Sequence, residues 1–285
     1  MKRTVLALTA LFVSLFVIVT LLKDGSPDEA TPFESQSLDA GDRDRIQRFW
    51  QSYRSATRHR TAGEIRQAAL EYQRALELDA THEDALYYLG SMHFELGEFA
   101  KAEGAWQRLT RVDPTGSRGF SRLGDLYFCF EQDRFFDPDR AQEMFERALG
   151  INSEETGPLL RLGQIALVKG ETSASMEYLE AVTATNFRSV AAYFFKGFLA
   201  WRDGDEHQAE QLFRLAAKHY EPAEPVQGVL SEGDTRSGKA ILAKVGQCQS
   251  FHAHAADLPS PDDPQLRNLM NERYRQLDLF LRNVR

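Results

Sequence analysis

The sequence predicts an all-α solenoid of about five helix hairpins, and three columns of regularly spaced residues predict it. A mid-helix glycine recurs with steps of 34, 39 and 34 residues, at Gly90, Gly124, Gly163 and Gly197. A column of small residues keeps steps of 34, 39, 34 and 34, at Ala68, Ala102, Ala141, Ser175 and Ala209. A column of large residues lies four places later and keeps the same steps, at Tyr72, Trp106, Phe145, Leu179 and Phe213. Small residues let two helices approach to roughly 8–10 Å between axes, and a large residue fills the space beside the crossing. One period and one shared insertion in three columns therefore predict stacked helix pairs.

The clearest repeat runs from Leu86 to Pro114 and reads LYYLGSMHFELGEFAKAEGAWQRLTRVDP. Two short amphipathic helices with a break at Gly97 fit this pattern. The stretch resembles the tetratricopeptide repeat, whose signature of aromatic, Leu-Gly, aromatic, Ala, aromatic and Pro extends over about 34 residues. The resemblance implies a right-handed superhelical solenoid that binds other proteins. The first repeat departs from the pattern, with Ala56 in place of the glycine, and the fourth has Ser175 in place of alanine.

Residues 1–4 are expected to be a cytoplasmic stub and residues 5–22 a transmembrane signal-anchor. The run VLALTALFVSLFVIVTLL carries no charge and covers roughly 27 Å as a helix, close to the ~30 Å hydrocarbon core of a bilayer. Lys2 and Arg3 precede it, which favours a cytoplasmic start. We therefore expect a single-pass protein of a bacterial inner membrane, with the repeats in the periplasm. A cleaved secretory signal and a buried core helix are the alternatives.

The rest of the chain divides into three predicted parts. Residues 23–42 are acidic and rich in Pro, Ser and Gly, which is typical of a flexible linker. Residues 43–221 hold the repeats, and residues 222–285 form a C-terminal extension. With 34 basic and 42 acidic residues the net charge is −8, which argues against a general nucleic-acid binder.

The third hairpin carries the five-residue insertion, within the segment FCFEQDRFFDPDRA. Asp137-Pro138 is typical of a helix start, with proline in the first turn. Phe135 and Phe136 could be an exposed contact point, but we expect both to pack against the next hairpin.

In the family that this chain resembles, the first helices of the hairpins line a concave groove. Carried over to this sequence, the resemblance implies a mostly apolar partner-binding groove of Tyr87, Phe94, Phe128, Leu160, Leu167, Phe194, Phe198 and Trp201. The chain lacks the Lys, Arg and Asn set with which some members hold a peptide carboxylate. We therefore expect the groove to bind a partner helix or extended segment through apolar anchors. Two alternatives are that part of this stripe is buried between hairpins and that the chain's own tail fills the groove.

The last predicted helix follows Asp263, a possible N-cap, and Pro264. Its apolar residues recur at steps of three and four as Leu266, Leu269, Met270, Tyr274, Leu277, Phe280, Leu281 and Val284. This stripe predicts a helix that caps the last hairpin; self-association or a partner helix are the alternatives. Upstream, residues 233–239 match GxxxxGK in letters, but Ala240 replaces the Ser or Thr that a phosphate loop needs. We expect a turn that leads into a helix over residues 239–245.

Cys129 and Cys248 are 119 residues apart, and nothing in that spacing demands a pair, so we expect two free thiols. Cys248, His252 and His254 offer metal ligands, but a fourth ligand is missing and we expect no metal and no cofactor. No histidine has a spacing that suggests nucleophilic catalysis, so we expect a binding protein and not an enzyme. A metal carrier or enzyme that uses the tail, and a structural dimer built through the C-terminal helix, are the alternative functions.

Overall fold

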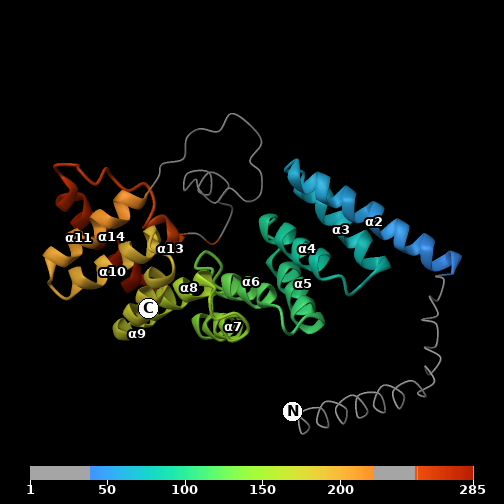
Figure 1. Ribbon diagram of the computed structural model, residues 1–285, viewed down its shortest axis with the longest axis horizontal. Coiled ribbons are helices and arrows are strands. Elements are labelled where there is room, and N and C mark those ends of the chain that lie inside the picture. Colours follow the sequence, from blue (N-terminus) through green and yellow to red (C-terminus); the bar gives the residue numbers. More distant parts are fainter. Residues whose placement is uncertain (1–38, 221–247, 249, 285) are drawn as a thin grey trace, which may run out of the picture. The chain divides into compact units, whose positions relative to one another are not determined.

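The computed structural model describes residues 39–220, 248 and 250–284, and every regular element in these ranges is an α-helix (Figure 1). Five hairpins follow one another, formed by α2 (Ala40–Thr61) with α3 (Ile65–Leu78), α4 (Glu83–Glu95) with α5 (Phe99–Val112), α6 (Ser117–Tyr127) with α7 (Pro138–Ile151), α8 (Thr156–Lys169) with α9 (Thr172–Thr185), and α10 (Val190–Arg202) with α11 (Glu206–His219). The tail contributes α13 (Ser250–Ala253) and α14 (Leu266–Val284). The predicted all-helical class is confirmed for these residues.

Glycines in the left-handed region end the first helix of four hairpins. They share φ values between +73° and +84° and occur at Gly63, Gly97, Gly170 and Gly204. This backbone conformation is unfavourable for residues that carry a Cβ. The third hairpin has no such glycine, because its insertion makes a longer connection between α6 and α7.

The glycine column lies where the two helices of a hairpin cross. A Cβ added to Gly90 would lie 2.3 Å from the Trp106 ring, and one added to Gly124 would lie 2.7 Å from the Phe145 ring. The large and small columns are buried throughout, which confirms the interpretation of the spacing. In the fourth hairpin the Ser175 hydroxyl donates a hydrogen bond of 2.8 Å to the Gly163 carbonyl. The polar group that serine adds in place of alanine is therefore hydrogen-bonded inside the core.

Neighbouring hairpins stack through apolar residues, because each hairpin leaves one side unburied. The second helix of one hairpin packs on the first helix of the next, as in the pairs α3–α4, α5–α6, α7–α8 and α9–α10. The first helices of the second to fifth hairpins therefore follow one another along the stack, and the predicted groove depends on them. They are α4, α6, α8 and α10.

The insertion of the third hairpin packs differently from the expectation. Asp137 caps α7 by accepting a hydrogen bond from the Arg140 amide, and Pro138 opens the helix, as predicted. Phe135 contacts Phe99 of the preceding hairpin, with ring centroids 5.8 Å apart. Phe135 thus packs on the preceding hairpin, which was not expected.

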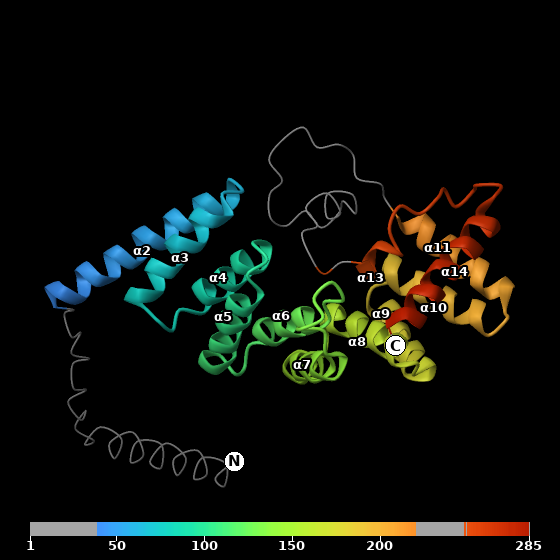
Figure 2. The same ribbon diagram turned by 180° about the vertical axis from the view of Figure 1, so that it is seen from behind.

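Helix α14 lies beside α10 and α11 in both views (Figures 1 and 2). It begins two residues after the predicted Pro264, and the Asp263 carboxylate accepts a hydrogen bond of 2.7 Å from the Gln265 amide. The buried members of its apolar stripe are Leu266, Met270, Tyr274, Leu277 and Leu281. Because α14 contacts α11 and also α8, it caps the last hairpin as predicted and also extends along the first helices.

Cys129 and Cys248 form a disulfide, with their Cα atoms 4.5 Å apart. The expectation of two free thiols is therefore wrong. The physical reason is that the tail folds back onto the third hairpin, so that 119 residues of sequence separation become direct contact.

Several predicted segments lie outside the described residues. They are the transmembrane anchor of residues 5–22, most of the linker of residues 23–42, and the helix of residues 239–245. Among the helices that are described, none combines the length and the apolar character needed to cross a bilayer.

Candidate functional site

The predicted groove is divided into a covered part and an open part. Four of its eight residues are fully buried and cannot line an open groove, namely Phe128, Leu167, Phe194 and Phe198. The other four are half-buried, namely Tyr87, Phe94, Leu160 and Trp201. The expectation that these four buried residues line an open groove is therefore wrong. Rings of the tail contact Phe128, Phe194 and Phe198, as in the alternative in which the chain's own tail fills the groove.

Tyr274 of α14 is the centre of the covered part. Its ring centroid lies 5.2 Å from that of Phe194 and 5.8 Å from that of Phe198. Its hydroxyl donates a hydrogen bond of 3.2 Å to the Phe194 carbonyl. Trp201 is also engaged, because its indole N–H donates to the Asn271 side chain at 2.8 Å. The apolar half of the groove is thus occupied by the chain itself.

The open part is formed by α4, α6 and the first half of α8, and it is polar as well as aromatic. The Arg122 guanidinium donates two hydrogen bonds to the Tyr87 hydroxyl, at 2.6 and 3.1 Å. Arg118 pairs with Asp84 at 2.8 Å and lies over the Tyr87 ring, 5.1 Å from its centroid. Tyr87 is therefore held between two arginines of the next repeat.

A second link continues the network to the fourth repeat. Asp125 accepts from Arg161 at 2.9 Å and lies 3.6 Å from Arg122. These three residues, with Ser91, Glu95, Phe94, Trp106 and Cys248, line a pocket of about 170 Å³. Burial would lower the pKa of Arg122, but Asp125 and Tyr87 outweigh it, so that the pKa is raised and the guanidinium stays charged.

The open part continues onto the first repeat as an aromatic cluster. Trp50 is 44% exposed, and its ring centroid lies 5.7 Å from that of Tyr53. Tyr53 also contacts the ring of His82 at 5.2 Å. Burial, with help from Asp84, raises the pKa of Tyr53 to about 12, so this phenol is a neutral hydrogen-bonding group at neutral pH.

Sequence reasoning missed the arginines of this surface. Arg118 lies one repeat period after Asp84, so the same column carries opposite charges in adjacent repeats. Arg122 and Arg161 likewise share one column, five residues farther apart because of the insertion. A search for charge complementarity between repeats would have found the first column but not the second, which carries arginine in both repeats.

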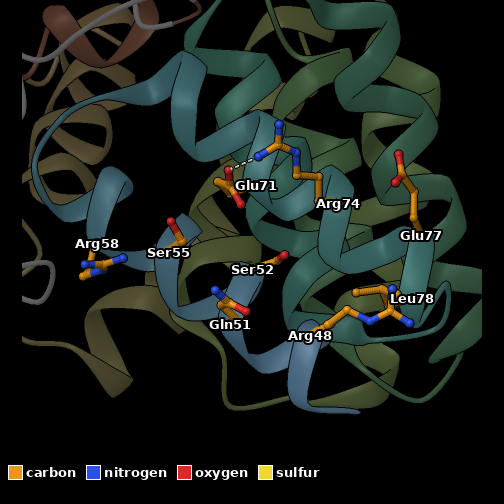
Figure 3. Close-up of a pocket in the computed structure, with 9 residues that line it drawn as sticks. All are labelled: Arg48, Gln51, Ser52, Ser55, Arg58, Glu71, Arg74, Glu77 and Leu78. Atoms are coloured by element: carbon orange, nitrogen blue, oxygen red, sulfur yellow. Dashed lines mark hydrogen bonds and ion pairs between the residues drawn. The ribbon is translucent and has the colours of Figure 1, made fainter. Parts of the chain in front are cut away.

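The pocket of about 520 Å³ between α2 and α3 has a different explanation (Figure 3). It is lined mainly by polar side chains, which include Gln51, Ser52, Ser55, Arg58 and Glu71. One period later the same positions are apolar and buried, as Ala85, Leu86, Leu89, Met92 and Ala105. In internal repeats this space is filled by the preceding hairpin, so the polar substitutions make the first repeat a solvated end of the array.

The tail's candidate metal ligands are used otherwise. Among the described residues, the one group of possible ligands is Cys129, Glu131 and Cys248, and the two sulfur atoms are bonded to each other. His254 packs on Phe280, with ring centroids 5.0 Å apart, and burial lowers its pKa. A metal site that needs the Cys248 thiolate is incompatible with this disulfide.

Comparisons with known proteins agree with this architecture. Residues 53–117 match the sequence model of the Tetratricopeptide repeat family. No curated protein matches the chain.

Solved structures with a similar fold include a structure of Pseudomonas aeruginosa pilF, at 17% identity and a TM-score of 0.55 over 83% of this chain and 99% of that chain. A crystal structure of the MamA protein has 20% identity and a TM-score of 0.54, over 64% of this chain and all of that one. A MamA fragment from Desulfovibrio magneticus RS-1 has 13% identity and a TM-score of 0.54, over 60% and 94% of the two chains. At such identities the likeness concerns the fold alone. Residues 53–117 thus match the tetratricopeptide repeat model, and helix pairs of the same kind continue as far as His219.

Proposed function

We propose that the chain is a membrane-tethered adaptor that binds a segment of a partner protein on its open concave surface. The observation that carries the proposal is the network of Tyr87, Arg122, Asp125 and Arg161 beside the half-buried Phe94. Tyr87 and Phe94 of this surface are half-buried, whereas Phe194 and Phe198 of the fifth repeat are fully buried in contact with Tyr274 of the tail.

The chemistry of the surface favours a mixed polar and apolar segment. Tyrosine and arginine are the residue types that most often dominate binding energy at interfaces. Because Tyr87 and Asp125 already hold the Arg122 guanidinium, less side-chain freedom is lost on binding. Backbone carbonyls or carboxylates of the partner would accept from the arginines, and one apolar side chain would contact Phe94.

The proposed location is a bacterial inner membrane, with the repeats in the periplasm and a role in the assembly of an envelope complex. The apolar run of residues 5–22 after Lys2 and Arg3 supports the anchor and its orientation. The Cys129–Cys248 disulfide supports an oxidising compartment. Protease added to spheroplasts should digest the repeats; protection until the membrane is disrupted would place them in the cytoplasm instead.

The proposed role is binding, without a catalytic step. The alternative of a dimer built through the C-terminal helix is disfavoured, because the apolar stripe of α14 is already buried against its own repeats. The alternative of a metal carrier loses a proposed ligand, because Cys248 is bonded to Cys129.

Affinity purification from detergent-solubilised native membranes tests the binding surface. Arg122→Ala removes the guanidinium at the centre of the network, and Arg66→Ala is the matched control on the exposed side of α3. A hot-spot loss of about 2 kcal/mol corresponds to roughly 30-fold weaker binding. We expect the wild type and Arg66→Ala to recover the same partner and Arg122→Ala to lose it while keeping its helical circular dichroism. Equal recovery by all three proteins, or no partner with any of them, would reject the proposed surface.

A further inference from the structure

The disulfide joins the tail to the repeats at a position where the tail begins to cover the groove. Cys129 is fully buried just after α6, and Cys248 lies 18 residues before the first residue of α14. The backbone of Cys248 has a φ of +73°, a conformation that a non-glycine residue rarely adopts. The bond thus fixes the start of the described tail on the third repeat.

Aromatic contacts surround this attachment and couple it to α14. Phe251 of α13 stacks on Phe130 of the insertion at 5.8 Å and contacts Phe128 at the same distance. Phe280 of α14 contacts Phe130 at 5.2 Å and Phe251 at 5.9 Å. The disulfide, α13 and the last part of α14 therefore form one packing unit on the third repeat, which explains why the insertion carries so many phenylalanines.

The surface under α14 is suited to an amphipathic helix, because such a helix already occupies it. Phe194 and Phe198 are buried by Tyr274, and Trp201 donates a hydrogen bond to Asn271. A partner helix with the same Tyr and Leu spacing would find the same contacts. This surface is separate from the open one, and the inference does not depend on the proposed function.

One cysteine of the disulfide lies at the wall of the open pocket. Cys248 is half-buried and lines that pocket together with Arg122 and Arg161. Two guanidinium groups favour the approach of a thiolate, which is the form that attacks a disulfide.

We propose that the Cys129–Cys248 bond is a redox latch, and that its reduction by a dithiol frees α14 and uncovers a helix-binding surface on α10. A thiolate of the dithiol attacks the Cys248 sulfur and forms a mixed disulfide, while Cys129 leaves as a thiolate and takes up a proton. The second thiol of the reductant loses its proton and displaces Cys248, so that the reductant becomes a disulfide and the protein gains two thiols.

Hydrogen–deuterium exchange of the full chain in detergent tests the latch, in its oxidised form and after treatment with dithiothreitol. Without the bond, the covalent path from the repeats to the first residue of α14 lengthens from 18 residues, counted from Cys248, to 46 residues, counted from Tyr220. Effective concentration falls roughly as the −3/2 power of tether length, so α14 should open at least about fourfold more often. We expect faster exchange in α14 and α10, with α4 and α5 unchanged as internal controls.

Two further measurements complete the test. The variant Cys129→Ser/Cys248→Ser should exchange like the reduced protein and should not respond to dithiothreitol. A fluorescent peptide of residues 264–284 should bind the reduced full chain at least about fourfold more tightly than the oxidised one, and its Tyr274→Ala form should bind the reduced chain at least tenfold more weakly. Unchanged protection of α14 together with no peptide binding after reduction would overturn the proposal. Faster exchange throughout, α4 and α5 included, would also overturn it, because the bond would then hold the whole array and not the tail.

Discussion

Gly197 offers a direct test of how the tail is seated. A Cβ added at this position would lie 2.2 Å from the Tyr274 hydroxyl and 3.3 Å from the Ala209 carbonyl oxygen. The Tyr274 side chain is fully buried and surrounded by the rings of Phe194 and Phe213, at 5.2 and 5.6 Å. It cannot rotate away, so Gly197→Ala must move α14 away from α10.

The expected size follows from two opposing effects. Alanine in a helix interior is favoured over glycine by about 0.5–1 kcal/mol, whereas overpacking a filled core costs about 1–3 kcal/mol. We therefore expect a net loss of about 0.5–2 kcal/mol in the free energy that holds α14 in place. Gly104→Ala in α5 is the matched control, because a Cβ there meets nothing within 4 Å, and it should stabilise its hairpin by about 0.5–1 kcal/mol.

Hydrogen exchange is the suitable assay, because a solenoid need not unfold in one step. Gly197→Ala should raise the exchange of α14 and α10 and leave α4 unchanged. Adding Tyr274→Phe removes the atom that clashes, and it should restore most of the protection. A Gly197→Ala protein as well protected as Gly104→Ala, or no rescue by Tyr274→Phe, would refute the seating described here.

Three further predictions concern other contacts. Burial, with the hydrogen bond to Glu103, raises the pKa of Tyr127 to about 12. Because the unfolded phenol ionises near pH 10, the contribution of Tyr127 to stability is present below pH 10 and is lost between pH 10 and about 12. Tyr127→Phe should therefore flatten the decline of the urea midpoint over that pH range. Hydrogen bonds from Arg267, and then from Arg214, lower the pKa of Glu210, so its stabilisation of the tail is present above about pH 4.5 and is lost as the pH falls through the lowered value. Glu210→Gln should speed α14 exchange at pH 7, and its difference from the wild type should shrink as the pH falls through that lowered value. Gly97 has a φ of +73°, so Gly97→Ala should destabilise the second hairpin by about 1–2 kcal/mol in urea unfolding, and a gain in stability would contradict the role given to this turn.

The repeats could be predicted because their signal is local and periodic. Gly90 and Trp106 contact each other within one hairpin, so their spacing recurs wherever the hairpin recurs. The step of 39 residues in place of 34 likewise predicted the insertion. The pair Asp137-Pro138 predicted the start of α7.

The division of the groove could not be predicted, because it depends on where the tail docks. The stripe of α14 indicates that one face is buried, but not against which helices, since Tyr274 meets Phe194 across 80 residues of sequence. The disulfide is hidden for the same reason. The polar character of the open part was missed because the positions inherited from family resemblance include Tyr87 but not the arginines that hold it.

Photo-crosslinking in native cells tests the central claim most directly, with a benzophenone amino acid placed at Tyr87 in one protein and at Phe198 in another. Tyr87 lies on the open surface, whereas Phe198 is buried under α14. The account predicts a crosslink to a partner protein from position 87 and, in the oxidised protein, a crosslink only within the chain from position 198. A partner captured from position 198 but not from position 87 would contradict it.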